Sequence, residues 1–247
     1  MHFDRLFKSL APVVALAAIG ALSACKGGDL RFNGKEGVPL ADLDLTGPVP
    51  SEVVLLGPDT VLIEPGEKLA VRVDGDPAAA GQLRFALDGG TLGILRERDG
   101  AAPAGRATVH VTMPAPGKLV LAGSGRMHAA AVAPEAEVSI AGSGTLETPA
   151  IDARRLEVAL AGSGTYVASG TTDDLELSIA GSGSGNLAGL KAGRAEINVA
   201  GSGDAVFASD GAVEARIMGS GTVTVRGSAR CTVKSMGSGK LVCERGD

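Results

Sequence analysis

The chain has 247 residues, 37 of them glycine, and only 2% are aromatic. So few aromatic side chains exclude a core filled by aromatic rings and leave little surface on which sugars or bases could stack. The formal net charge of -5 excludes the basic surface that nucleic-acid binding needs, so no nucleic-acid partner is expected.

The first residues are typical of an exported bacterial lipoprotein. Arg5 and Lys8 precede an apolar run, residues 10–22, which is typical of a secretory signal and too short for a comfortable membrane span. A Leu-Ser-Ala-Cys sequence ending at Cys25 resembles the lipobox, in which the cysteine thiol takes a diacylglyceryl group. We therefore expect residues 1–24 to be a signal peptide and Cys25 to be lipidated. The alternative is an ordinary signal peptide followed by a chance cysteine.

Residues 25–50 are rich in glycine, proline and charge and show little periodicity. This composition predicts a flexible tether between the lipid and a folded body. The membrane is then a partner through the lipid anchor, and the protein is expected in the cell envelope. Lys26, in place of the aspartate that commonly retains lipoproteins at the inner membrane, favours the outer membrane.

Residues 51–118 contain short runs of alternating apolar and polar residues, separated by glycine and proline turns. Such alternation predicts strands with one buried face. We expect these strands to cap the N-terminal end of the fold that follows, or to begin its stack. The four clearest runs are residues 60–63, 68–73, 82–87 and 107–112.

A Gly-Ser-Gly triplet recurs with a spacing of 18 to 20 residues through residues 119–247. An alternating strand precedes each triplet and a shorter one follows it, so each repeat reads as strand, tight glycine corner, strand and looser corner. A period near twenty predicts a solenoid. The triplets begin at Gly123, Gly142, Gly162, Gly181, Gly201, Gly219 and Gly237.

Stacking these repeats in register predicts an all-β fold, a parallel β-helix with about 18–20 residues per coil and an N-terminal β cap. Residues one repeat apart then lie above one another, roughly 4.8 Å apart. One inward column would contain valine, leucine, isoleucine and alanine in successive coils. Its members are Val138, Val158, Leu177, Ile197, Ala215 and Val233.

The sequence resembles the bacterial GIN-domain family, described as an auto-transporter adhesin head. The resemblance lies in the Ala-Gly-Ser-Gly corners after alternating strands, and in the segment 61–73 and Gly93-Ile94-Leu95 before them. The resemblance covers about residues 52–245. It implies a right-handed parallel β-helix exported to the cell envelope, often on a lipoprotein. It implies no catalytic motif.

One outward column is acidic in five successive coils. Like charges about 4.8 Å apart repel, by roughly 1 to 3 kcal/mol at an effective dielectric of 20 to 80. Cations two positions to either side, such as Arg155, Arg194 and Arg216, could offset this and leave a compensated charge lattice. The alternative is a stripe that binds divalent cations or a cationic partner. The five residues are Glu137, Glu157, Glu176, Glu196 and Glu214.

Two cysteines remain besides Cys25. Cys231 and Cys243 both point inward on opposite strands of the last two coils, where an oxidising envelope could join them. They are predicted either as a disulfide that pins the C-terminal end or as two small buried thiols.

The sequence predicts no catalytic residues, metal site or cofactor. The serines of the triplets lack the strand-to-helix elbow and the base that a nucleophile needs, and His110 and His128 lack zinc-ligand spacing. We therefore expect a non-enzymatic envelope lipoprotein, an adhesin-like or scaffolding module with flat faces for an envelope protein or polymer. The alternatives are a polysaccharide-acting enzyme, which would rely on acids such as Asp174 or Asp204, and a self-associating spacer.

Overall fold

The computed structural model describes residues 31–32, 35–97 and 105–244, so the predicted signal peptide and Cys25 lie outside the described residues. Of the described residues, 70% are in strands and 4% in helices, and they wind into a parallel β-solenoid of about 7 turns. The prediction of an all-β parallel β-helix is confirmed. Within the described ranges, no helix has the length and apolar character needed to cross a membrane.

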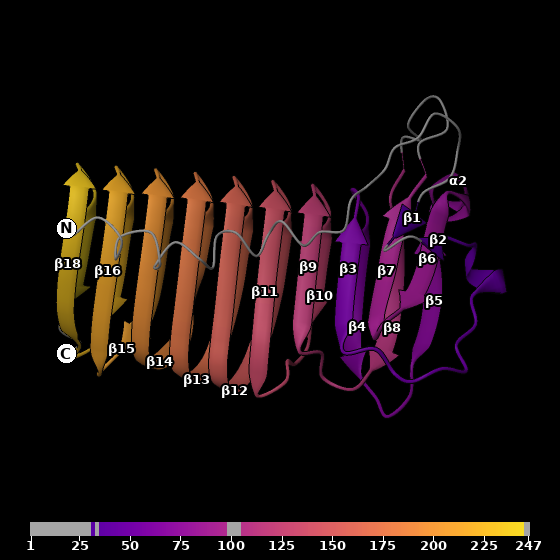
Figure 1. Cartoon of the computed structure of the whole chain (residues 1–247), viewed down its shortest axis with the longest axis horizontal. Helices are drawn as coiled ribbons and strands as arrows, with labels where there is room; N and C mark the ends of the chain where they lie inside the picture. Colours follow the sequence, from indigo (N-terminus) through magenta and orange to yellow (C-terminus); the bar gives the residue numbers. More distant parts are fainter. Residues whose placement is uncertain (1–30, 33–34, 98–104, 245–247) are drawn as a thin grey trace, which may run out of the picture.

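The Gly-Ser-Gly repeats form successive coils stacked along one axis (Figure 1). In the middle of the stack, one strand of 17 or 18 residues runs around the coil from one glycine corner to the next. These three strands are β12 (Thr145–Gly162), β13 (Thr165–Gly181) and β14 (Ser184–Gly201). Toward the two ends the coil is divided into shorter strands. They are β9 (Lys118–Gly123), β10 (Arg126–Ala129), β11 (Glu135–Gly142), β15 (Asp204–Ser209), β16 (Ala212–Gly219), β17 (Thr222–Arg226), β18 (Arg230–Gly237) and β19 (Lys240–Glu244).

Each coil pairs with the next in parallel and in the register that the repeats predict. Gly142 lies opposite Gly162, which lies opposite Gly181. The corner requires glycine because its first residue has a positive φ, 112° at Gly162 and 115° at Gly181. Backbone bonds continue around the corner, where the N–H of Ser163 donates to the carbonyl of Gly142 at 2.9 Å.

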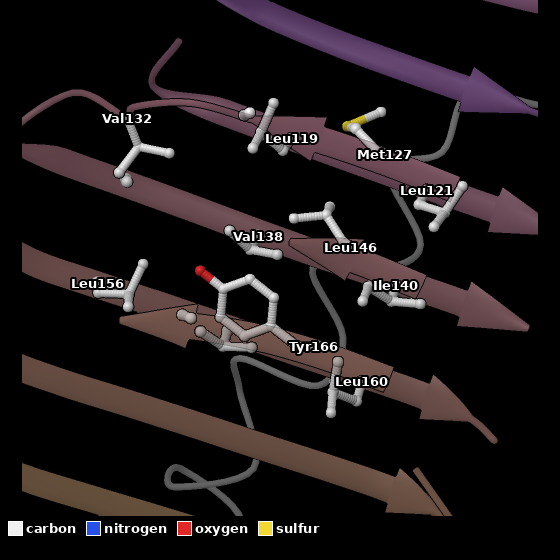
Figure 2. Packing of buried hydrophobic residues seen from close by; sticks show 14 of the residues in the cluster. Leu119, Leu121, Met127, Val132, Val138, Ile140, Leu146, Leu156, Leu160 and Tyr166 are labelled. Atoms are coloured by element: carbon white, nitrogen blue, oxygen red, sulfur yellow. The ribbon is translucent and has the colours of Figure 1, made fainter. Parts of the chain in front are cut away.

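The core is a set of aliphatic columns inside the coil (Figure 2). In the predicted column, Val138, Val158, Leu177, Ile197 and Ala215 are at most 2% exposed. Leu119 continues this column, and Leu121, Leu146 and Tyr166 pack in neighbouring columns (Figure 2). Narrow layers of aliphatic side chains therefore replace an aromatic core.

The N-terminal strands are threaded differently from a simple winding order. β3 pairs in parallel with β9 on one side and with β7 on the other, and β4 lies likewise between β10 and β8. The first coil of the chain therefore lies inside the stack. These strands are β3 (Glu52–Leu56), β4 (Thr60–Pro65), β7 (Thr91–Arg96) and β8 (Ala107–Met113).

Two antiparallel strands cover the N-terminal end, which confirms the predicted β cap. β5 (Ala70–Gly75) pairs with β8, and β6 (Leu83–Asp88) pairs with β7. The short helix α2 (Pro77–Gly81) joins them, and the Asp76 carboxylate caps it by accepting the N–H of Ala79 at 2.9 Å. Figure 1 shows this cap at the end of the stack opposite β18.

Part of the predicted tether is docked on this cap. This segment contains β1 (Arg31–Phe32), β2 (Lys35–Glu36) and the 3-10 turn η2 (Leu40–Asp42). Between β2 and η2, Val38 exchanges both backbone hydrogen bonds with Phe85, at 2.9 and 2.7 Å. Leu40 and Leu43 pack against the core. The prediction of a flexible tether up to residue 50 is therefore wrong for this part, because the backbone of Val38 pairs with the edge of β6 and Leu40 and Leu43 pack against the core.

Candidate functional site

The glutamates of the predicted row lie side by side on the outer face of the sheet formed by β11, β12, β13, β14 and β16. The parallel register places each glutamate directly opposite the next. Lys118 and then Glu52 continue the row at one end, and Thr232 ends it at the other. The row consists of Glu137, Glu157, Glu176, Glu196 and Glu214.

The first three glutamates each have a cationic partner. Lys118 Nζ lies 3.1 Å from Glu137 Oε1. Arg155 serves two carboxylates, since its Nη2 lies 2.9 Å from Glu176 Oε2 and 3.7 Å from Glu157 Oε2. The arginine that the sequence places two positions before the row therefore lies between two of its carboxylates.

The last two glutamates share Arg216, from the flanking column on the other side. Its Nη1 contacts Glu196, and its Nη2 lies 3.6 Å from Glu214 Oε2. Arg194 instead pairs with Asp174, donating through Nε and also through Nη2 at 2.7 Å. Asp174 lies between Arg155 and Arg194 in the flanking column, so this column contains an anion as well as the predicted cations.

These contacts make the face a compensated charge lattice. Each exposed pair contributes only about 0 to 1 kcal/mol, but together they offset the repulsion along the row. Among the described residues, no group of three His, Cys, Asp or Glu side chains could hold a metal ion. The carboxylate of Asp204, which follows a triplet, accepts the N–H of Thr222 at 2.8 Å.

The carboxylates differ in electrostatic environment. Glu176 has the lowest side-chain exposure in the row, 25% against 65% for Glu214. Burial raises the pKa of Glu176, and repulsion from Glu157 and Glu196 raises it further, while Arg155 opposes this. Hydrogen bonding from Arg194, by contrast, lowers the pKa of the neighbouring Asp174.

A groove of about 320 Å³ lies at the centre of this face. Two arginines and four carboxylates line it, so its formal charge is 2 − 4 = −2. Such a surface favours a cationic or hydrogen-bond-donating partner. The lining residues are Arg155, Asp174, Leu175, Glu176, Arg194, Ala195, Glu196, Ala212 and Glu214.

The outer face on the other side of the glycine corners has a different composition. Its first row aligns Arg126, Thr145, Thr165, Ser184 and Asp204, and its second aligns His128, Glu147, Val167 and Asn186. Small polar and β-branched side chains occupy the centre of this face, which carries fewer charged side chains than the glutamate face.

The other candidates from the sequence lie apart from the groove. His110 Nε2 lies 3.2 Å from Asp74 Oδ2 near the cap. His128 lies in β10 beside Leu62 and Glu147. Backbone hydrogen bonds join successive corners, and Ser235 Oγ donates to the carbonyl of the corner residue Gly239 at 3.0 Å. Among the described residues, no hydrogen bond joins two triplet serine hydroxyls.

Cys231 and Cys243 are joined by a disulfide in the structure, with their Cα atoms 6.7 Å apart. Cys231 lies opposite Val213 of the preceding coil, and Cys243 lies opposite Val225. The bond connects the two strands of the last coil across its interior.

Sequence reasoning missed two buried polar pairs. The fully buried Asp59 occupies the place of a corner glycine, contacts Arg96 and accepts the N–H of Ala107 at 2.8 Å. Inside a later coil, Thr148 and Tyr166 share a hydrogen bond of 2.6 Å. Asp59 could have been noticed because it breaks the Gly-x-Gly pattern, but its partner lies 37 residues away.

The solenoid, its glycine corners and its β cap agree with one protein family. A family model described as "putative auto-transporter adhesin, head GIN domain" matches residues 50–229. The chain belongs to this family. The GIN-domain resemblance predicted from the sequence is therefore confirmed, and the family points to a binding module and to the cell envelope or surface.

Solved structures share the fold of this GIN-domain chain. A "putative adhesin" from Bacteroides fragilis is 16% identical with a TM-score of 0.71, covering 79% of this chain and 93% of that one. A "putative lipid binding protein" from Parabacteroides distasonis is 22% identical with a TM-score of 0.62, covering 79% and 92%. A "putative adhesin" from the same organism is 15% identical with a TM-score of 0.58, covering 81% and 93%. No curated protein is significantly similar in sequence.

Proposed function

We propose that this GIN-domain chain is a non-enzymatic binding module, lipid-anchored at Cys25 to the outer membrane, which presents its outer sheet faces to an envelope protein or polymer. The observation that carries the proposal is the rigid outer face with charged side chains in register on successive coils. A surface fixed by backbone pairing loses little conformational entropy on binding.

The glutamate face is the proposed contact surface. Its groove has a net charge of −2 and offers both carboxylate acceptors and guanidinium donors. A partner that carries ammonium or guanidinium groups could form ion pairs with the glutamate carboxylates at each coil, in place of the arginines that pair with them in the free protein. Family membership and the adhesin descriptions of similar structures support a binding role of this kind.

Binding is tested on residues 26–247, which contain every described strand. The purified chain is measured by calorimetry against isolated peptidoglycan, which carries free amino groups, and on an array of envelope glycans. We expect saturable binding that weakens at high salt, because the contacts are ionic. Turnover of any glycan would overturn the assignment as non-enzymatic.

Two matched variants locate the surface. Glu176→Lys with Glu196→Lys reverses the charge of the groove, and it should abolish binding. Thr165→Lys with Val167→Lys places the same number of lysines on the other face and should leave binding intact. If both variants bind equally, the glutamate face is not the contact surface.

Anchoring is tested separately in a Gram-negative host. The full chain should fractionate with the outer membrane, and mass spectrometry should find acyl chains on the N-terminal cysteine. The variant Cys25→Ser should be released from the membrane. Membrane retention of that variant would contradict lipidation at Cys25.

A further inference from the structure

The two ends of the solenoid differ. At the N-terminal end, β5 and β6 cover the outermost coil, which β7 and β8 form, and Val38 pairs with the outer edge of β6. At the other end, β18 pairs only with β16, and β19 pairs only with β17, among the described strands. Figure 1 shows β18 as the terminal strand of the stack. Two strand edges are therefore open on the described C-terminal coil.

The interior of this last coil is exposed along with its edges. In the inward column, Ile197 and Ala215 are 0% and 2% exposed, but Val233, next in register, is 46% exposed. Ser235, which follows Ile217 in a second inward column, is exposed as well. The apolar columns therefore end at a surface without a following layer among the described residues.

The backbone at this surface is ready to pair. The N–H of Arg230 donates to Gly211 of the preceding coil at 2.8 Å. Because alternate residues of a strand direct their N–H groups to opposite sides, those of Val233 and Ser235 point to the open edge. Open edges of this kind are templates for another strand.

The disulfide gives the two edges a fixed separation. Cys231 in β18 and Cys243 in β19 are bonded across the coil with Cα atoms 6.7 Å apart. An occupant that satisfies both edges must therefore offer two strands held across a similar core. A single extended peptide can satisfy only one of them.

We propose that this end binds the same end of a second copy of the chain, in a two-fold symmetric dimer. A two-fold axis normal to the sheets reverses the strand direction and keeps each sheet on its own side of the core. β18 would then pair antiparallel with its counterpart, and β19 with its own, so that both sheets continue through the interface. Two-fold interfaces of this self-complementary kind are the commonest in soluble oligomers.

The N-terminal end of a second copy would fit the open C-terminal coil less well than the C-terminal end does. Its outermost strands are the cap strands β5 and β6, and the edge of β6 is occupied by Val38. A dimer through the C-terminal ends also leaves both glutamate faces accessible. The dimer interface is separate from the glutamate face, and it forms without a ligand.

Sedimentation velocity of residues 26–247 from low to high micromolar concentration tests the proposal. We expect the mass to rise from one chain to two and then stay constant. Val233→Lys should raise the dissociation constant at least about tenfold, because it places a charged side chain from each copy in the apolar interior of the interface. Ser235→Pro, which removes an edge N–H, should weaken the dimer independently of charge.

Met218→Lys is the matched control. Met218 is 46% exposed, as Val233 is, but it lies in β16, whose two edges are already paired with β14 and β18, and the variant should leave the dimer intact. Circular dichroism verifies that each variant is folded. A chain that stays monomeric, a mass that grows without limit, or a dimer weakened by Met218→Lys and not by Val233→Lys would overturn the proposal.

Discussion

Gly201→Ala tests whether the glycine corner is a steric requirement of the solenoid. Gly201 has a φ of 128°, and a Cβ added there would lie 2.3 Å from the carbonyl oxygen of Gly181 in the preceding coil. That oxygen accepts the N–H of Ser202 at 2.8 Å, so moving it also disturbs a hydrogen bond between coils.

The cost of this substitution has two parts. A non-glycine residue in that backbone region costs of order 1 to 3 kcal/mol. Relieving the overlap with a paired backbone carbonyl adds about 1 to 3 kcal/mol. Alanine also lowers the conformational entropy of the unfolded chain, which offsets this cost by roughly 0.4 to 1 kcal/mol. We therefore expect the free energy of unfolding to fall by about 1 to 5.6 kcal/mol.

Urea denaturation followed by circular dichroism measures the change. Gly47→Ala is the control for the residue type, since a Cβ at Gly47 meets nothing within 4 Å. Ser202→Ala is the control for the corner, because that side chain is exposed. Both should stay within about 0.5 kcal/mol of the parent chain. A Gly201→Ala variant as stable as these controls would refute the steric reasoning.

Three further predictions concern charge and covalent links. Asp59→Asn should lower the free energy of unfolding by about 3 to 5 kcal/mol in the same urea assay, because it removes the negative charge that pairs with the buried Arg96. A loss below about 1 kcal/mol would contradict this prediction. Because burial and neighbouring carboxylates raise the pKa of Glu176, its folded form binds a proton more readily than its unfolded form. Stability from this group should therefore rise as pH falls from neutral through the raised pKa, and Glu176→Gln should remove that rise while Glu214→Gln keeps it. Removing the disulfide with Cys231→Ser and Cys243→Ser should destabilise the last coil by about 2 to 3 kcal/mol. Hydrogen exchange should then become faster in that coil and stay unchanged in β13. Uniformly faster exchange along the chain would argue against a local role of the disulfide.

The repeat made most of the solenoid predictable. Because side chains alternate along a strand and glycine corners recur at one period, Val158 had to lie opposite Val138, and Glu157 opposite Glu137. Parallel pairing within one winding ribbon transmits this register from coil to coil. The inward columns, the glutamate row and the cysteine placement all follow from it.

The ion pairs of the column two positions before the glutamate row were less predictable than its register. Asp174 stands between Arg155 and Arg194 in one column. Which of them pairs with the row depends on side-chain conformation, and sequence spacing leaves that open. Arg155 reaches the glutamates, whereas Arg194 pairs with Asp174.

The sequence alone determined the winding of residues 119–244, because a local pattern repeated at a fixed period specifies its own neighbours. Only the tertiary structure decided the threading of the N-terminal part, where β3 lies between β7 and β9 and the chain reverses direction in β5 and β6. Non-repeating strands carry no internal register, so burial of apolar faces against an existing coil selects their partners. The same reason explains why the buried pair of Asp59 and Arg96 was found only in three dimensions.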